Sequence, residues 1–208
     1  MMKSEIYVKD GMTRVGRIVK TMFDILSACI LLVVLLPISI VIYIAIKRED
    51  HGPVIFKQER IGRFGRPFLI YKFRSMRLDA ESQGPRLYKS GVDKRMTKIG
   101  KFLREHHLDE IPQLVNVIKG DMSFVGPRPE RKFYIDQIME KDDRYPCLFQ
   151  VRPGVTSYAT LYNGYCDNID KMVKRLRIDL IYIRRRSLWT DIKIMVATVC
   201  KVSKGSKF

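Results

Sequence analysis

Two adjacent carboxylates, Asp109 and Glu110, are the residues of this sequence best suited to do chemistry. They stand in the run Leu-Asp-Glu-Ile-Pro-Gln-Leu at 108–114, in a chain whose formal charge is +17. Adjacent carboxylates repel each other, so their pairing indicates a use: ligands of a divalent metal ion, a nucleophile, or both. The structural alternative is a helix that begins with Asp109 as N-cap, tolerates Pro112 and ends at Gly120.

A second candidate is Arg128, which lies between Pro127 and Pro129. Proline restricts its own backbone and that of the residue before it, so the backbone that presents Arg128 is preset. Phosphoryl transfer is catalysed mainly by positioning and charge stabilisation, and a preset guanidinium supplies both. The pattern therefore favours a phosphate-binding arginine over a rigid turn with an incidental one.

Basic residues also surround two predicted strands, at 53–58 and 68–73, whose connection contains Gly62, Gly65 and Pro67. The polar and basic members are Gln58, Arg60, Arg63, Arg66, Lys72 and Arg74. Arginine binds phosphate with two parallel hydrogen bonds, and glycine lets backbone amides approach an anion. A phosphate site is one interpretation, and a solvated basic edge that deters strand pairing is the other.

His106 and His107 precede the acidic pair, so a transition-metal cluster must be considered. Neighbouring helical positions point in different directions, and two histidines and two acids do not easily share one ion. Mg²⁺ bound by Asp109 and Glu110 is therefore the favoured metal site. The sequence contains no serine-protease triad order, P-loop or dinucleotide fingerprint.

The element that most constrains these groups is the apolar stretch from Thr21 to Ile46. A continuous helix of this length would measure about 39 Å and cross a bilayer core, but Pro37 divides it. Basic residues flank both ends of the stretch, namely Arg14, Arg17 and Lys20 before it and Lys47 and Arg48 after it. The positive-inside tendency keeps both ends on the cytoplasmic side, which favours a re-entrant helix over a straight span, with a soluble core helix third.

The remaining elements follow from periodicity and turn residues. We predict a basic surface helix at 12–22, helices at 95–105, 110–119, 129–141, 169–186 and 188–203, a polar loop at 75–94 and irregular structure at 152–164. With 208 residues and no linker or repeat, the chain indicates a single domain at 1–208. Its membrane-associated part is expected at 12–48 and a mainly helical cytoplasmic catalytic part at 49–208. The expected fold class is α+β.

The charge balance, 39 Lys and Arg against 22 Asp and Glu, implies anionic partners. Phe68, Tyr71 and Phe73 interleave with basic residues, as a nucleic-acid stacking platform would. The apolar segment argues against nucleic acid, because anionic membrane lipid and phosphorylated substrates already account for the charge. The alternative function is a membrane-anchored basic module that binds lipid or nucleic acid without catalysis.

Several of these segments, taken in order, resemble the bacterial sugar transferases, specifically the small monotopic phosphoglycosyl transferases. After the Pro-containing apolar stretch come GPVIFKQER at 52–60, YKFRSM at 71–76, LDEIPQL at 108–114, KGDMSFVGPRP at 119–129 and VRPGVT at 151–156. The resemblance covers residues 12 to 202. It implies transfer of a sugar 1-phosphate from a UDP-sugar to polyprenyl phosphate, usually undecaprenyl phosphate, with release of UMP.

The resemblance also implies roles for individual residues. Asp109 would be the nucleophile that carries a phosphosugar intermediate, and Glu110 would help hold Mg²⁺. By the same resemblance Lys72 and Arg128 face the substrate phosphates, Gln58, Arg60 and Arg104 lie nearby, and Asp179 supports the site or the architecture. The enzyme would act in the bacterial inner membrane with its catalytic part facing the cytoplasm, at the first membrane step of making a surface glycan such as an exopolysaccharide or capsule. A homodimer is compatible with it.

Two departures from the family pattern concern substrate contacts. The family commonly continues with a Gly-aromatic-Ala-Gln run and a later Gly-Arg-Asn, where this chain has Ser-Tyr-Ala-Thr at 157–160 and Asn-Gly-Tyr-Cys-Asp at 163–167. An arginine near the donor is thereby missing, so the donor sugar cannot be inherited from the family. His106 and His107 also replace small polar residues.

Overall fold

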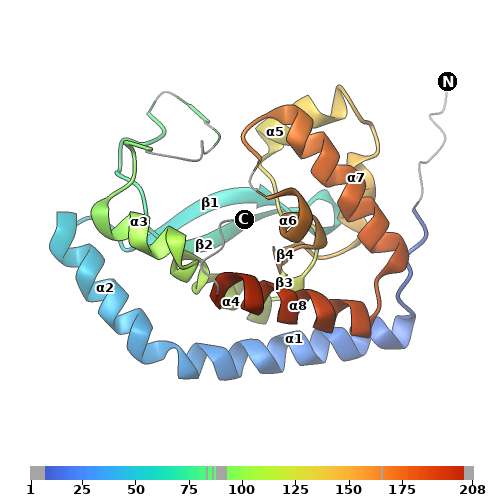
Figure 1. The fold of residues 1–208 in the computed structure, drawn as a ribbon, viewed down its shortest axis with the longest axis horizontal. Coiled ribbons are helices and arrows are strands. Elements are labelled where there is room, and N and C mark those ends of the chain that lie inside the picture. The colour runs from blue at the N-terminus through green and yellow to red at the C-terminus, as the bar shows by residue number, and fades with distance from the viewer. Residues whose placement is uncertain (1–7, 83, 86, 88–92, 165, 204–208) are drawn as a thin grey trace.

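The computed structural model describes residues 8–82, 84–85, 87, 93–164 and 166–203. Helices surround two small sheets, one an antiparallel hairpin and the other a parallel pair, so the α+β expectation is confirmed (Figure 1). The helices α1 (Arg14–Val34) and α2 (Leu36–Asp50) run along one edge of the molecule in that view.

A bend of 61° separates α1 from α2, and Leu35 lies at the break. Pro37 occupies the second position of α2. Because proline has no backbone N–H, it cannot donate a helical hydrogen bond to a carbonyl group of α1, and its ring clashes with the carbonyl group four residues earlier. The predicted division of the apolar stretch is therefore confirmed. Within the described residues, the membrane-crossing criteria of length and apolar content are met only by α1 and α2 taken together as a bent pair.

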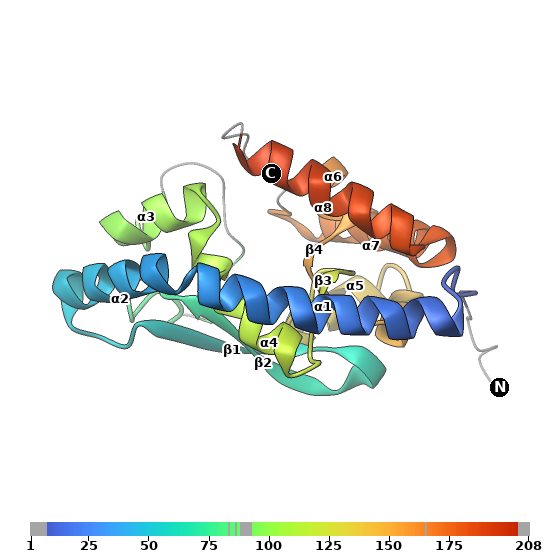
Figure 2. The ribbon, with the colours of Figure 1, turned by 90° about the horizontal axis from the view of Figure 1, so that it is seen from below.

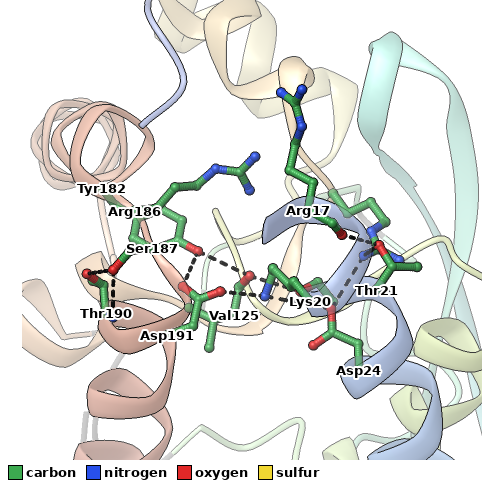
Figure 3. A network of polar contacts seen from close by, with 12 residues as sticks. Arg17, Lys20, Thr21, Asp24, Val125, Tyr182, Arg186, Ser187, Thr190 and Asp191 are labelled. Atoms are coloured by element: carbon green, nitrogen blue, oxygen red, sulfur yellow. Dashed lines mark hydrogen bonds and ion pairs between the residues drawn. The ribbon is translucent and has the colours of Figure 1, made fainter. Parts of the chain in front are cut away.

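Charged side chains fasten α1 to α8 (Leu188–Ser203), as Figure 3 shows. Lys20 Nζ lies 2.7 Å from the Asp191 carboxylate and 3.6 Å from Asp24, and all three residues are buried. Ser123 Oγ donates to Asp24 at 2.7 Å, and the Tyr182 hydroxyl donates to Asp191 at 2.7 Å. We call Lys20, Asp24 and Asp191 the anchoring cluster, because they tie the first half of α1 to the rest of the fold.

The predicted hairpin is confirmed as β1 (Ile55–Ile61) and β2 (Pro67–Phe73), paired in register from Ile55 with Phe73 to Ile61 with Pro67. A short 3-10 turn, η1 (Arg63–Gly65), connects the strands. The outer edge of β2 is held by Asn116 of α4 (Gln113–Ile118). Its side chain accepts from the Tyr71 N–H at 3.0 Å and donates to the Leu69 carbonyl at 2.7 Å, as a neighbouring strand would.

The second sheet was not predicted. It pairs β3 (Ser123–Val125) in parallel with β4 (Gly154–Thr156), and α6 (Tyr158–Asn163) follows β4. The expectation of irregular structure at 152–164 is therefore wrong. Strands of three residues are too short to show an alternating pattern, and their pairing depends on contacts far away in sequence. Gly126 and Gly154 make it possible, because a Cβ on either would collide with the backbone of the other segment.

The remaining helices follow the predicted order with shorter bounds. They are α3 (Lys98–Glu105), α5 (Lys132–Met139) and α7 (Ile169–Arg185). The 3-10 segment η3 (Tyr145–Gln150) was not predicted. The last predicted helix is confirmed as α8, and the predicted surface helix at 12–22 is the beginning of α1. Part of the predicted 75–94 loop lies outside the described residues. The largest apolar cluster lies between α5, η3 and α7, and two smaller ones lie under α4 and α2.

Candidate active site

The acidic pair lies on a 3-10 turn, η2 (Leu108–Glu110), and not at the start of an α-helix. The expectation that Asp109 caps a helix at 110–119 is wrong, because α4 begins only at Gln113, after Pro112. His107 precedes the turn with a left-handed backbone, φ 55°, which costs a residue with a side chain conformational energy. The predicted stop at Gly120, φ 82°, is confirmed.

Glu110 is held between two cations. Lys72 Nζ of β2 donates to Glu110 Oε1 at 2.6 Å, and Arg128 Nη2 donates to the same oxygen at 2.8 Å. Burial disfavours the charged carboxylate, but the two cations outweigh it and hold the pKa of Glu110 far below its usual range. Glu110 is therefore a fixed negative charge.

Asp109 has the opposite electrostatic character. Its carboxylate is buried, and Lys72 Nζ lies 3.9 Å away. Burial and the neighbouring Glu110 charge raise the pKa of Asp109, although Lys72, Arg104 and Arg128 act against this. A poorly solvated carboxylate with a raised pKa is more basic and more nucleophilic than an ordinary aspartate.

The loop that carries Arg128 is supported by residues of two elements, β1 and α7. Arg60 of β1 donates to the Pro129 carbonyl at 3.4 Å and lies 3.5 Å from Glu130. Glu130 also forms a buried ion pair with Arg175 of α7. Asp179, one turn further along α7, accepts from the backbone N–H of Arg128 and of Ala159, and burial raises its pKa to about 7. The structure thus places Asp179 beneath the arginine loop, where it supports the architecture.

A polar cavity of about 290 Å³ opens on the Asp109 side of the pair. Its lining includes Gln58, Arg60, Lys72, Arg74, Arg104, Asp109 and Arg128. All five predicted phosphate-binding residues therefore meet at one cavity. Arg63 and Arg66 of the hairpin turn are not among the lining residues, and Arg63 Nε donates instead to the Gln150 carbonyl at 3.2 Å. The predicted basic cluster is thus divided, because the hairpin is long enough to carry its turn away from the site.

A second cavity, of about 210 Å³, opens on the Glu110 side. It is lined by Leu35, His107, Glu110, Ile111, Leu114, Arg128, Val155, Thr156, Thr160, Gly164, Arg175, Thr198 and Val202. We call it the apolar cavity. Burial lowers the pKa of His107. The negative charge of Glu110 acts to raise this pKa, and the positive charges of Arg128 and Lys72 act to lower it further. Arg128 and Arg175 line both cavities, so the two spaces meet at the acidic pair.

Sequence reasoning missed four residues of this arrangement: Asn116, Glu130, Tyr134 and Arg175. Glu130 directly follows the Gly-Pro-Arg-Pro run, which is the one signal that could have indicated it. The Tyr134 side chain lines the polar cavity, and its buried hydroxyl has no hydrogen-bond partner among the described residues. Buried polar groups are normally paired, so this hydroxyl is available to a ligand in the cavity.

The carboxylates fit a magnesium ion only with help from a substrate. No group of three or more His, Cys, Asp or Glu side chains in the described ranges could hold a metal. Mg²⁺ is, however, often bound by one or two carboxylates together with substrate phosphates and water. The pair of Asp109 and Glu110 beside an arginine-lined cavity has this composition.

The carboxylate pair thus lies among cations where a polar and an apolar cavity meet, an arrangement that suits a phosphorylated ligand. Comparison with protein families agrees: the model of the bacterial sugar transferases matches residues 15–205. The chain belongs to that family.

Individual relatives share about two fifths of their residues with this chain over the matched region. A UDP-glucose:undecaprenyl-phosphate glucose-1-phosphate transferase of Escherichia coli (strain K12) is 41% identical over 90% of this chain and 40% of its own length. A UDP-N-acetylgalactosamine-undecaprenyl-phosphate N-acetylgalactosaminephosphotransferase of Aeromonas hydrophila is 38% identical over 90% of this chain and 44% of its own. A UDP-glucose:undecaprenyl-phosphate glucose-1-phosphate transferase of Caulobacter vibrioides is 37% identical over 86% and 68%. The chain thus spans less than half the length of the first two.

Proposed function

We propose that this protein transfers a sugar 1-phosphate from a UDP-sugar to polyprenyl phosphate, such as undecaprenyl phosphate, and releases UMP. The observation that carries the proposal is the contrast within the acidic pair: a cation-bound Glu110 next to a buried Asp109 with a raised pKa. The named activities of the relatives are of this class.

In the first half-reaction an Asp109 carboxylate oxygen attacks the phosphorus that bears the sugar. The bond between that phosphorus and the bridging oxygen breaks, and UMP departs with the electron pair. The product is an acyl phosphate, a mixed anhydride between the Asp109 carboxyl group and the sugar phosphate. In the second half-reaction an oxygen of the lipid phosphate attacks the same phosphorus, and the Asp109 carboxylate leaves.

The surrounding cations make the attack feasible, because a carboxylate is otherwise repelled by an anionic diphosphate. Lys72 and Arg128 are held within hydrogen-bond distance of Glu110, so they are already ordered beside Asp109. Asp109 and Glu110 would hold Mg²⁺ together with diphosphate oxygens, and the ion would supply further charge neutralisation when bound.

The polar cavity is the place we assign to the nucleotide end of the donor. Arg60, Arg104 and Arg128 line it and suit a diphosphate. The Tyr134 hydroxyl at the same cavity has no hydrogen-bond partner among the described residues, and it would find one in the nucleotide. The sugar itself is not assigned, because relatives of similar identity are named for glucose and for N-acetylgalactosamine.

For the bent pair α1–α2 we propose a re-entrant placement in the bacterial inner membrane, with the catalytic part in the cytoplasm. Its outer residues are apolar and exposed, for example Val15, Leu26, Val33, Val34 and Val41. The anchoring cluster supports the proposal, because ion pairs and hydrogen bonds hold Lys20 to α8 and Asp24 to β3. A helix that crossed the bilayer in a straight line would have to break these contacts. Both basic ends then lie on the same side.

The enzyme test uses the purified chain with Mg²⁺, undecaprenyl phosphate and a panel of UDP-sugars. We expect UMP release with at least one donor and formation of a lipid diphosphate-sugar. If no UDP-sugar of the panel yields UMP, the proposed activity is wrong. The chain would then be a non-catalytic module that binds anionic lipid.

Topology is tested separately by labelling single cysteines placed at Lys9 and at Glu49, on either side of the bent pair. We expect a membrane-impermeant thiol reagent to reach both only from the cytoplasmic side. Opposite sidedness of the two positions would establish a straight span.

A further inference from the structure

The apolar cavity is lined mainly by apolar side chains and by three charged ones. Leu35 from the α1–α2 break, Val155 from β4 and Val202 from α8 contribute to the wall. Glu110, Arg128 and Arg175 are the charged residues of the lining, and both arginines also line the polar cavity. A ligand that matches this surface is an amphiphile with a compact anionic head and a hydrocarbon body.

The hydroxyl groups in the wall are engaged with other protein groups, which argues against a sugar as the occupant. Thr156 Oγ1 and Thr198 Oγ1 hydrogen-bond to each other at 2.8 Å, and Thr198 also donates to the Ile194 carbonyl at 2.8 Å. Thr160 Oγ1 is 2.7 Å from Ser157 Oγ. These pairings turn three threonines into a largely apolar lining, whereas sugar recognition needs polar groups directed at the ligand.

The surroundings of the cavity are also apolar. Next to Leu35, the side chains of Val34 and Leu36 are exposed by 64% and 53%. On α8, which provides Thr198 and Val202, Val196 is exposed by 57%. Seen from below, α8 lies on one side of α1, and α4 with the hairpin lies on the other (Figure 2). The cavity therefore lies among the helices that present apolar side chains to the exterior.

We propose that the apolar cavity holds the phosphate-proximal isoprene units of the acceptor lipid, with the lipid phosphate at Arg128 and Arg175. This inference rests on the proposed function and adds the acceptor's route to it. Nucleotide and lipid then approach the acidic pair through different cavities. Arg128 lines both cavities. The lipid phosphate therefore reaches the phosphosugar on Asp109 at the position that UMP has left.

The test separates the two half-reactions. Exchange of labelled UMP into the UDP-sugar needs only the first half-reaction and no lipid, whereas product formation needs both. Val202→Trp and, independently, Leu35→Trp fill the apolar cavity. We expect each to raise the KM for undecaprenyl phosphate about tenfold, with a much smaller change in the exchange rate.

Val196→Trp is the matched control, because it adds the same side chain to the same helix at an exposed position outside the cavity. We expect its KM for the lipid to match the wild type. Equal losses of exchange and transfer in both cavity variants would overturn the inference and assign the cavity to the donor. An unchanged lipid KM in both would also overturn it.

A second measurement needs no variant. A polyprenyl phosphate with a photoreactive group in its first isoprene unit should crosslink to Leu35, Leu114 or Val202. Crosslinks confined to Tyr134 or Met172, which line the polar cavity, would overturn the inference. If the wild-type chain catalyses no exchange with any UDP-sugar, the proposed function fails by itself. Exchange without these lipid effects makes only the inference fail.

Discussion

Two clusters in this protein have the same composition, one lysine between two carboxylates, but different surroundings. In the anchoring cluster, Lys20 lies between Asp24 and Asp191. In the acidic-pair site, Lys72 lies 2.6 Å from Glu110 and 3.9 Å from Asp109. The first cluster joins α1 to α8 and lines neither the polar nor the apolar cavity, whereas the second lies where the two cavities meet.

The difference shows that burial of charge does not by itself identify a catalytic site. In the anchoring cluster, groups from β3 and α7 complete the carboxylates: Ser123 donates to Asp24 and Tyr182 to Asp191. In the acidic-pair site the two carboxylates are adjacent in sequence, and Glu110 accepts hydrogen bonds from both Lys72 and Arg128. Asp109 keeps a raised pKa beside a cavity that can admit a substrate. Four substitutions test this distinction.

The largest effect is expected from Asp109→Asn. The amide is nearly isosteric but cannot form the acyl phosphate, so we expect turnover to fall by about 10⁴-fold or more. Thermal unfolding should occur at the same or a higher temperature, because a poorly solvated buried charge is removed. UMP release and a melting curve measure the two effects. Asp143→Asn, at an exposed position, is the control. Near-normal turnover of the Asp109→Asn variant would exclude Asp109 as the nucleophile.

Asp191→Asn should produce the opposite result. It leaves the buried Lys20 with only Asp24 at 3.6 Å, so we expect a loss of stability of about 3 kcal/mol. At a temperature where the variant is still folded, it should keep at least about a third of its turnover. The melting temperature and the turnover are measured on the same preparation of the variant. A loss of activity without a loss of stability would mean that the anchoring cluster takes part in the reaction.

Arg128→Gln is expected to reduce kcat/KM about 10²-fold, because a preorganised cation is lost from the developing phosphate charge. The side chain is partly exposed, so the melting temperature should change little. The exposed Arg66, on the hairpin turn, provides the control Arg66→Gln. Equal activities of the two variants would show that net charge, and not the position of Arg128, matters.

The smallest effect is expected from Asp179→Asn, and it concerns pH. The folded-state pKa of Asp179, about 7, lies above its ordinary value of 3.8, so protonated Asp179 stabilises the fold. This contribution is complete below about pH 4 and is lost as the pH rises through about 7. The variant should show a flatter dependence of stability on pH across this window, measured by denaturant unfolding. An unchanged slope would show that Asp179 does not titrate there.

Much of the fold could be predicted from local signals. The break of the apolar stretch follows from Pro37, the hairpin from its strand residues and glycines, and α7 and α8 from their periodicity. The β3–β4 pair could not be predicted, because three-residue strands are defined by their partner and not by their own pattern. The cap assigned to Asp109 was wrong because Pro112 delays the start of α4.

The residues of the candidate site were likewise only partly predictable from local sequence signals. Asp109, Glu110 and Arg128 were indicated by residue type and by rigid neighbours, and the structure brings them together with Lys72. Asn116, Glu130 and Arg175 were missed, because they act through side chains that meet elements far away in sequence. Nothing in their own neighbourhoods distinguishes Asn116 and Arg175 from ordinary helix residues, whereas the Gly-Pro-Arg-Pro run directly before Glu130 could have indicated that residue.

The sequence by itself determined the chemical groups: a carboxylate pair, a proline-framed arginine, an excess of cations and a divided apolar stretch. Each of these is written in neighbouring residues, whose covalent order constrains the backbone directly. Only the tertiary structure decided that Asp109 and Glu110 face different cavities and have opposite pKa shifts. The physical reason is that burial and the distance to a charge depend on how remote elements pack, here β2, α7, α8 and the arginine loop around one short turn.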